Sequence, residues 1–473
     1  MSFTGAGFFI CPGEMTGSDV RKLRAGKGHH MEFISGQTQK KVVEISDILS
    51  GGYEGRQISM NGAVHTIRDM GDVAFVILRK REGLVQTIFE RGAVDMDFRQ
   101  LKEAATVEVT GTVKKEGRAP NGFEIRLQAV QVLSEPKEPM PIPINKWKLG
   151  TSLETKLNLR PISLRNVKER AKFKIQEGIV RAFRDYLFSQ GFTEIHTPKI
   201  GAKGAEGGAN IFKLDYFHRP AILEQSPQFY KQMMVGVFDR VFETAPVFRA
   251  EKHNTKRHLN EYTSLDFEMG YIDSFQDIMQ METGFLQHMV KLLKEQYARE
   301  LDILGVALPS VERIPQVRFD EAKKLVSEKY DRDIRNPYDL EPEEEALIGQ
   351  YFKEEYGADF VFVTHYPSKK RPFYAMDDPA DPTYTLSFDL LFGGLEITTG
   401  GQRIHDLDTL ENKIKARGMT DEGMEHYLMI FRHGMPPHGG LGIGLERMTM
   451  KLLGEENVRE TTLFPRDLSR LEP

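Results

Sequence analysis

Basic side chains are concentrated in a loop between two strand-like segments. The runs Arg240–Phe248 and Thr263–Ile272 are typical of strands, and their order predicts an antiparallel hairpin. Its tip holds five basic side chains, namely Lys252, His253, Lys256, Arg257 and His258. Arg249 and Glu251 are two residues apart, so we expect them on one face of the hairpin. A solvated loop is the alternative, but so many cations beside an arginine and acids indicate a site for a polyphosphate and a polar ring.

Two acidic residues, Asp389 and Glu396, flank a predicted turn. Apolar runs lie on both sides of Gly393 and Gly394, a pair typical of a two-residue hairpin. In such a hairpin Glu396 lies opposite Leu391, and Asp389 is its diagonal neighbour on the same face. Neighbouring carboxylates repel each other unless a cation lies between them, and Mg²⁺ binds one or two carboxylates together with phosphate oxygens. The pattern therefore predicts a magnesium site, with two solvated surface acids as the alternative.

Further polar residues occur near predicted turns and helix starts. Gln228 and Lys231 are three residues apart at the start of a predicted helix, and Arg403 follows the hairpin just described. Fixed cations at Lys231 and Arg403 suit a small substrate that carries a carboxylate. Arg447 follows a glycine-rich turn near the start of the last helix, from where it can reach a terminal phosphate. Each residue alone is also compatible with the protein surface, so the prediction rests on the set.

The bulk composition sets limits on the class of protein. The chain has 473 residues, of which 40% are hydrophobic and 28% charged, as expected for two or three globular domains. Its net charge of −5 gives no general attraction to nucleic acid, so such binding requires a local basic patch. The single cysteine, Cys11, excludes an internal disulfide and fits a reducing compartment. Without a secretory signal or an apolar run of about 18 residues, we expect a cytoplasmic protein with no membrane contact.

Residues 55–134 show the pattern of a small β-barrel. Five strand-like runs occur there, with a helical segment at Asp97–Ala105 between the third and the fourth. This order is typical of an OB-fold, a common oligonucleotide-binding module, although a barrel that binds no nucleic acid is the alternative. We interpret residues 1–40 as a flexible extension, so that the barrel domain spans 41–134.

A second domain follows a proline-rich stretch. Residues 135–160 are predicted to be a linker, because four prolines within eight residues favour extended backbone. The domain 161–473 begins with a long helix, Ser163 to Gly191, and the strand Thr193–Pro198. A mainly helical insertion between sheet strands is expected at about 275–385.

Taken together, these features resemble the class II aminoacyl-tRNA synthetases, and specifically the aspartyl-tRNA synthetases of the archaeal and eukaryotic type. The resemblance covers about residues 41–473. It rests on the segment ending at Pro198, the hairpin Phe248–Glu268 and Gly442–Arg447, together with Glu206-Gly-Gly, Gln225-Ser-Pro-Gln-Phe-Tyr-Lys, Phe248-Arg-Ala-Glu, Arg257-His-Leu-Asn-Glu, Gly400-Gly-Gln-Arg, Met435-Pro-Pro-His-Gly-Gly and Phe464-Pro-Arg-Asp. The implied fold is α+β, with an N-terminal OB-fold β-barrel followed by a class II catalytic domain built on an antiparallel sheet flanked by helices.

The resemblance implies ATP and Mg²⁺ as cofactors. Arg249 would bind the α-phosphate of ATP and Arg447 its γ-phosphate, as the two catalytic residues. The other residues implied in the ATP site are Glu251, which would also place the tRNA end, with Arg257, His258, Glu261, Tyr262 and Glu396. Mg²⁺ would bind Asp389, Glu396 and Thr399. Tyr262 stands where the family more often has Phe, and Thr399 where it usually has Ser.

The resemblance also implies L-aspartate and tRNA(Asp) as substrates and a homodimer as the assembly. Aspartate would react with ATP to give aspartyl-adenylate, and the 3′-terminal ribose of tRNA would then take the aspartyl group. The implied aspartate pocket consists of Glu206, Gln228, Lys231, Thr399, Arg403 and His438. The cations Lys231 and Arg403 would contact the side-chain carboxylate of the substrate.

The barrel carries the residues implied in tRNA choice. Phe75, Gln86 and Glu124 match positions that read the anticodon, and Arg68 matches a nearby contact. His65 stands where relatives that charge only tRNA(Asp) tend to have Trp, whereas family members with His often accept tRNA(Asn) as well. We therefore predict relaxed tRNA choice, with a neutral substitution in the barrel as the alternative.

Three other functions are open on the sequence. An asparaginyl-tRNA synthetase shares this architecture, but Lys231 would meet the amide without compensation. A lysyl-type enzyme is disfavoured because Lys231 and Arg403 would repel a lysine side chain. An inactive paralogue that binds nucleic acid or regulates is disfavoured by four intact residues, Arg249, Asp389, Glu396 and Arg447.

Overall fold

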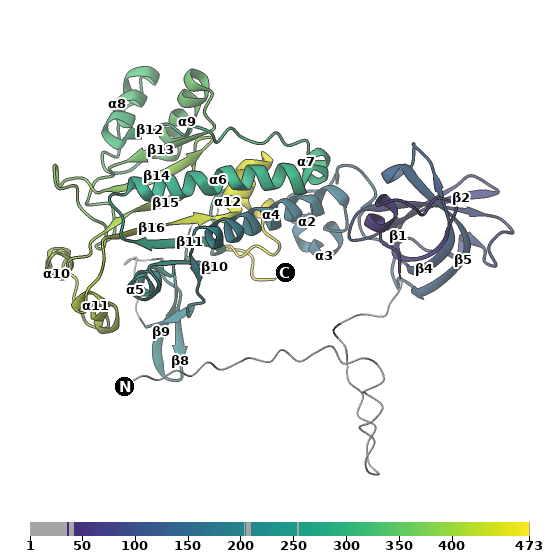
Figure 1. Cartoon of the computed structure of the whole chain (residues 1–473), viewed down its shortest axis with the longest axis horizontal. Helices are drawn as coiled ribbons and strands as arrows, with labels where there is room; N and C mark the ends of the chain where they lie inside the picture. Colours follow the sequence, from purple (N-terminus) through teal and green to yellow (C-terminus); the bar gives the residue numbers. More distant parts are fainter. Residues whose placement is uncertain (1–35, 37–41, 203, 205–209, 253–254, 473) are drawn as a thin grey trace, which may run out of the picture. The chain divides into compact units, whose positions relative to one another are not determined.

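The described part of the computed structural model comprises residues 36, 42–202, 204, 210–252 and 255–472. It divides into two compact units, Met1–Pro136 and Lys137–Pro473, which are treated separately below (Figure 1). The predicted extension, residues 1–40, lies outside the described residues except for Gly36. Among the helices of the described ranges, none is long and apolar enough to cross a membrane.

The first unit contains a closed barrel with strand order β1-β2-β3-β5-β4. Its strands are β1 (Gln57–Asp69), β2 (Val73–Arg79), β3 (Leu84–Glu90), β4 (Thr106–Lys115) and β5 (Phe123–Ser134), preceded by the short helix α1 (Ile45–Leu49). Alternate apolar side chains such as Met60, Val76 and Ile125 fill the interior. This architecture confirms the predicted OB-fold.

The helix expected at Asp97–Ala105 is only one 3-10 turn, Phe98–Gln100. The Asp97 side chain accepts a hydrogen bond from the Arg99 amide and caps this turn. Phe98 and Leu101 are buried in the barrel core, and Ala104 has φ 71°, a left-handed conformation that ends helical geometry before β4. A second 3-10 turn, Pro120–Gly122, precedes β5.

The second unit is built on an eight-stranded sheet with the order β12-β13-β14-β15-β16-β11-β10-β6. The strands from β16 to β10 and from β13 to β16 pair antiparallel, whereas β6 with β10 and β12 with β13 pair parallel at the edges. Their bounds are β6 (Thr193–Glu194), β10 (Arg240–Phe248), β11 (Glu261–Gly270), β12 (Gln316–Arg318), β13 (Phe360–Thr364), β14 (Ser387–Phe392), β15 (Leu395–Arg403) and β16 (His438–Gly444). The predicted antiparallel catalytic sheet is thereby confirmed.

Helices α4 (Val167–Ser189) and α6 (Gln276–Gln296) lie side by side along the sheet in Figure 1. The Asn166 side chain accepts hydrogen bonds from two backbone amides and so sets the start of α4. Apolar side chains of both helices form one core with Leu265 and Phe267 of β11. Because side chains of a strand alternate between faces, Ser264, Asp266 and Glu268 must point away from this core.

The remaining helices surround the sheet and the small sheet β7-β9-β8. The small sheet comprises β7 (Ile200–Gly201), β8 (Lys213–Tyr216) and β9 (Arg219–Leu223). The helices are α2 (Leu153–Asn158), α3 (Arg160–Ser163), α5 (Gln228–Phe238), α7 (Ala298–Leu304), α8 (Phe319–Tyr330), α9 (Pro342–Tyr356), α10 (Leu407–Ala416), α11 (Glu425–Arg432) and α12 (Leu445–Leu453), followed by the 3-10 turn Val458–Thr461.

Three boundaries differ from the sequence expectations. The range 275–385, expected to be mainly helical, also contributes β12 and β13 to the main sheet. The strand expected at Thr193–Pro198 is only two residues long. Part of the predicted linker belongs to the second unit, since Ile142 and Ile144 are buried in a small apolar cluster there.

Candidate active site

A cavity of about 510 Å³ lies on the face of the sheet opposite the α4–α6 core. Eleven residues singled out from the sequence line it: Gln228, Lys231, Arg249, Glu251, Arg257, His258, Tyr262, Glu396, Thr399, Arg403 and Arg447. They come from α5, the β10–β11 hairpin, β15 and α12, which are far apart in the sequence. The sheet therefore gathers most of the predicted site in one place.

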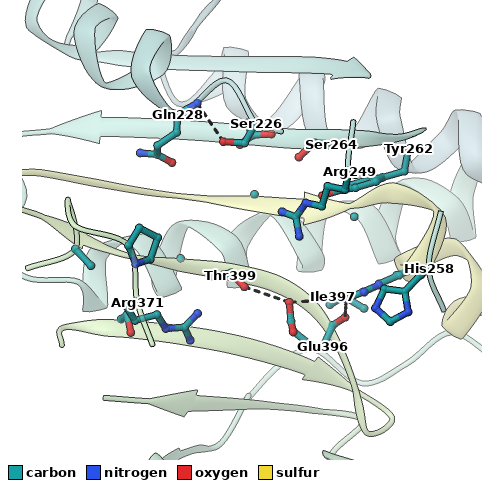
Figure 2. Close-up of a pocket in the computed structure, with 18 of the residues that line it drawn as sticks. Ser226, Gln228, Arg249, His258, Tyr262, Ser264, Arg371, Glu396, Ile397 and Thr399 are labelled. Atoms are coloured by element: carbon teal, nitrogen blue, oxygen red, sulfur yellow. Dashed lines mark hydrogen bonds and ion pairs between the residues drawn. The ribbon is translucent and has the colours of Figure 1, made fainter. Parts of the chain in front are cut away.

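The β10–β11 hairpin forms one wall of this cavity. Its register pairs Val247 with Tyr262, and the Arg249 amide donates to the Asn260 carbonyl at 2.9 Å. The Arg249 guanidinium carbon lies 5.6 Å from the centre of the Tyr262 ring. Figure 2 shows both side chains across the cavity from Glu396. A cation next to an aromatic face can hold a phosphate and a base side by side.

The β14–β15 hairpin carries the acidic residues, and a β-bulge sets their direction. Leu391 pairs with Glu396 as predicted, but Leu390 pairs with Thr398, which leaves Ile397 as an extra residue. Without a bulge, Glu396 and Thr399 would point to opposite faces of the strand. With it, the Thr399 hydroxyl donates to Glu396 Oε1 at 3.2 Å (Figure 2). The bulge thus brings two of the three implied metal ligands together.

Asp389 has a partner that the sequence did not reveal. The Arg371 Nη2 atom lies 2.7 Å from Asp389 Oδ1, and the Arg371 guanidinium stacks on the Tyr366 ring at 3.9 Å. Burial raises the pKa of Asp389 to about 6, and the charge of Glu396 adds to this rise while Arg371 opposes it. Burial also tends to raise the pKa of Glu396. The charges of Arg447, Arg371 and Arg249 outweigh burial and hold this pKa below its ordinary value.

Lys231 and Arg403 are held by two buried acids, Asp266 and Glu268. Lys231 Nζ donates to Asp266 Oδ1 at 2.9 Å and lies 3.4 Å from Glu268 Oε2. Arg403 Nε donates to Glu268 Oε1 at 2.8 Å, and its Nη2 donates to the Gly440 carbonyl at 2.8 Å. Although burial opposes ionisation, Arg403 and Lys231 hold the pKa of Glu268 below its ordinary value. The two cations are therefore fixed before any substrate arrives.

The alternation of apolar and acidic residues along β11 indicates that these two acids share one face of the strand. Leu265, Phe267 and Met269 face the core, so the intervening Asp266 and Glu268 must face the other side. Two acids on the buried face of a central strand require cationic partners. Arg371, in contrast, lies between β13 and β14, outside any helix or strand, and no periodicity marks it.

Three predicted pocket residues are not placed on the cavity wall. His438 is fully buried on β16; its Nε2 lies 2.9 Å from Gln232 Nε2 and its Nδ1 2.9 Å from the Pro436 carbonyl. Burial lowers the pKa of His438 to about 4, so the ring is neutral. Glu261 ends the hairpin with an exposed side chain. Glu206 lies outside the described residues.

A smaller cavity of about 200 Å³ contains the outer cations and Asp389. It shares four residues with the larger cavity, namely Arg257, His258, Glu396 and Arg447. The Arg447 Nη1 donates to the Glu396 carbonyl at 3.1 Å, and its Nε donates to the Arg257 carbonyl at 3.2 Å. Burial and the charge of Arg447 lower the pKa of His258. Arg447 thus links the hairpin loop to the acidic strand.

In the barrel, the strand register brings the predicted anticodon residues onto adjacent strands. Arg68 of β1 pairs with Phe75 of β2, and Gln86 of β3 pairs with Glu124 of β5. Gln86 Nε2 donates to Glu124 Oε2 at 3.1 Å. His65 is 4% exposed and lies between the paired residues Val64 and Thr66, where the register shifts. Its side chain is therefore buried rather than on the surface.

Comparison with known proteins agrees with this arrangement. Residues 152–468 match the family described as class II tRNA synthetases (D, K and N), and residues 58–133 match the OB-fold nucleic acid binding domain. The chain is a class II aminoacyl-tRNA synthetase. The cavity on the antiparallel sheet is accordingly the candidate active site of the synthetase, and the barrel its candidate anticodon-binding domain.

The relatives of the synthetase include aspartate enzymes of both tRNA specificities. It is 46% identical over 427 residues to the aspartate--tRNA(Asp/Asn) ligase of Deinococcus radiodurans, covering 89% of this chain and 97% of the relative. It is 40% identical over 437 residues to the aspartate--tRNA(Asp) ligase of Pyrococcus horikoshii, covering 91% and 98%. An asparaginyl-tRNA synthetase structure from Pyrococcus horikoshii, complexed with asparaginyl-adenylate, matches with a TM-score of 0.83 at 30% identity, covering 92% and 100%.

Proposed function

We propose that this synthetase joins L-aspartate to tRNA through an aspartyl-adenylate. The observation that carries the proposal is the fixed cation pair of Lys231 and Arg403 on the cavity wall. Both lie where a small substrate would sit beside Arg249, and both can donate to a side-chain carboxylate. Gln228 adds a buried amide nitrogen that has no hydrogen-bond partner among the described residues. These groups suit an acidic amino acid next to a nucleotide.

The proposed reaction requires no covalent bond to the protein. An oxygen of the aspartate α-carboxylate attacks the α-phosphorus of ATP, the bond to the β-phosphate oxygen breaks, and pyrophosphate leaves. Arg249 would neutralise charge on the α-phosphate, and Arg447 and Arg257 on the outer phosphates, while Tyr262 would stack on adenine. Rate enhancement then comes from alignment and charge neutralisation.

The acidic residues fit a bound Mg²⁺. Asp389 and Glu396 both line the smaller cavity, and their mutual repulsion and burial favour a cation between them. Among the described residues, no third His, Cys, Asp or Glu completes a metal-binding cluster. The remaining ligands would then be the Thr399 hydroxyl, water and phosphate oxygens, as Mg²⁺ prefers. When bound, Mg²⁺ would neutralise charge on the phosphates of ATP.

The proposal is extended to tRNA(Asn) because the chain has His65. The supporting comparison is with the relative of Deinococcus radiodurans, whose name includes both tRNAs. Because His65 is buried, it would act by shaping the barrel rather than by touching a base. Charging of purified tRNA(Asp) and tRNA(Asn) with radiolabelled aspartate tests this extension. Failure to aspartylate tRNA(Asn), with normal charging of tRNA(Asp), would disprove it.

We also propose a homodimer. The ends of α4 and α5 expose the large apolar side chains Phe188, Val237 and Phe238 by 54%, 58% and 46%. The edge strand β6 follows α4 directly and has two residues. Sedimentation equilibrium measures the mass in solution, and a monomer at micromolar concentration would contradict this part of the proposal.

Amino-acid-dependent exchange of pyrophosphate into ATP tests the substrate. We expect exchange with aspartate and little with asparagine or lysine. Exchange with asparagine but not aspartate would overturn the proposal in favour of an asparaginyl-tRNA synthetase. Absence of exchange with every amino acid would favour an inactive, tRNA-binding paralogue.

A further inference from the structure

Glu345, on the first turns of α9, contacts both sides of the candidate ATP site. One of its carboxylate oxygens, Oε2, accepts a hydrogen bond from Arg257 Nη2 at 2.7 Å. The same oxygen accepts a hydrogen bond from the Glu396 backbone amide at 3.3 Å. The Glu345 side chain is 7% exposed, and the Arg257 side chain 20% exposed. A single buried oxygen thus joins the hairpin loop to the acidic strand.

The contacts of Glu345 lie at the boundary between the two cavities. Glu345 itself lines only the smaller one, whereas Arg257 and Glu396 line both. The Arg257 Nε atom is buried and has no hydrogen-bond partner among the described residues. Because Arg257 also lines the larger cavity, its guanidinium can be held by Glu345 on one side and still face a ligand that enters there.

We propose that Glu345 is a positioning residue that fixes Arg257 relative to Glu396 so that the outer phosphates of ATP, and the pyrophosphate released from them, are bound between the two. The inference rests on the proposed function, because it takes the ligand to be a nucleoside triphosphate. Without Glu345, the guanidinium on a long side chain would sample several rotamers, and binding would have to order it first. The carboxylate keeps it in place in the free enzyme.

The neighbouring Glu344 provides a matched control on the same helix. It is fully buried, and its Oε2 accepts hydrogen bonds from Lys323 Nζ at 2.6 Å and from the Glu341 amide at 2.7 Å. It lines neither cavity. A Glu344→Gln variant therefore removes a buried charge from α9 without touching Arg257 or Glu396.

The test compares Glu345→Gln with Glu344→Gln and the wild-type enzyme in two measurements. The first is the pyrophosphate concentration that half-saturates the aspartate-dependent exchange, and the second is inhibition by AMP, which lacks the outer phosphates. For Glu345→Gln we expect pyrophosphate binding roughly tenfold weaker, with AMP binding changed less than about twofold, as for loss of one charge-assisted contact. Glu344→Gln should leave both unchanged, whatever it does to the melting temperature.

Two further results bear on the proposal. Combining Glu345→Gln with Arg257→Gln should weaken pyrophosphate binding no more than Arg257→Gln alone, because both changes remove one interaction. Equal weakening of AMP binding and pyrophosphate binding in Glu345→Gln, or no weakening of either, would overturn the role of Glu345.

A wild-type enzyme that exchanges with asparagine instead of aspartate would overturn the proposed substrate only, since the comparison of pyrophosphate with AMP can be repeated with that amino acid.

Discussion

Arg403 and Glu268 form a buried two-point ion pair, in which Arg403 Nε lies 2.8 Å from Glu268 Oε1 and Nη2 lies 3.4 Å from Oε2. The same carboxylate lies 3.4 Å from Lys231. One acid therefore orients both cations that would bind the substrate carboxylate. If these cations bind the substrate, amino-acid selection would depend on a residue that does not itself line the cavity.

Replacing Glu268 by Gln should separate aspartate binding from ATP binding. The KM for aspartate in pyrophosphate exchange should rise at least about tenfold, because Arg403 and Lys231 lose their common anchor. The KM for ATP should stay within about twofold. Loss of the buried charge should also lower the free energy of unfolding by about 3 kcal/mol, measured in urea. An unchanged KM for aspartate would show that Asp266 and the backbone suffice to place the cations.

Tyr262 should contribute through its ring rather than its hydroxyl group. Tyr262→Phe keeps the aromatic face beside Arg249, so the KM for ATP should change less than about twofold. Tyr262→Ala removes the face and should raise the KM for ATP about tenfold. The KM for aspartate is the internal control, since Tyr262 contacts Arg249, whereas Lys231 is bound to Asp266, further along β11. Equal effects of the two variants would contradict stacking.

Glu282 should make stability depend on pH. It is fully buried on α6, its Oε1 accepts from the Thr398 hydroxyl at 2.6 Å, and burial raises its pKa to about 8. The unfolded state loses the Glu282 proton near pH 4.5, whereas the folded state keeps it up to about pH 8. The contribution of Glu282 to the free energy of unfolding is therefore fully present below pH 4.5 and is lost as the pH rises to 8.

The Glu282→Gln variant removes this titration. Its stability relative to wild type should increase between about pH 4.5 and 8, by on the order of 5 kcal/mol in total. Urea unfolding at several pH values measures the difference. A constant difference across that range would show that Glu282 is ionised in the folded protein.

Gly394 should be far less tolerant of substitution than Gly393. Both have positive φ, but a Cβ atom on Gly394 would lie 2.7 Å from the Ala346 Cα atom, whereas on Gly393 it would meet only the flexible end of Lys451 at 3.0 Å. Gly394→Ala should destabilise the protein by about 2 kcal/mol or more and slow adenylate formation, because Glu396 follows closely. Gly393→Asn is the matched control and should be nearly neutral in thermal denaturation. Similar losses for both would mean that the turn is not packed on α9 in solution.

The barrel residues should affect tRNA charging alone. Phe75→Ala should raise the KM for tRNA about tenfold, by loss of one stacking face, and leave pyrophosphate exchange unchanged. Arg118→Ala, at a side chain that is 96% exposed, is the control for a nonspecific loss of surface charge or contact. If Phe75→Ala charged tRNA(Asp) normally, the anticodon would have to be read elsewhere.

Local sequence patterns predicted helices, strands and turns better than they predicted the contacts between distant segments. Strands β2 and β3 and the pairing of Leu391 with Glu396 follow directly from alternation and turn chemistry. The bulge at Ile397 and the Arg371–Asp389 pair were missed, because they depend on which strands and loops meet in space. His438 was expected to line the pocket; it lies on the same face of β16 as Gly442, which does line the cavity, but its ring is fully buried against Gln232 and Pro436, and a motif does not show such burial.

The close contact of Gly349 with Gly394 has a consequence for the dynamics of the enzyme. A Cβ atom on Gly349 would lie 2.3 Å from the Gly394 nitrogen, so α9 and the β14–β15 turn touch backbone to backbone. No side chain lies between the two backbones, so none can adjust to movement by changing its rotamer. Helix and turn should therefore open together, and their amide hydrogens should exchange with solvent deuterium as one cooperative unit whose protection increases when ATP is bound.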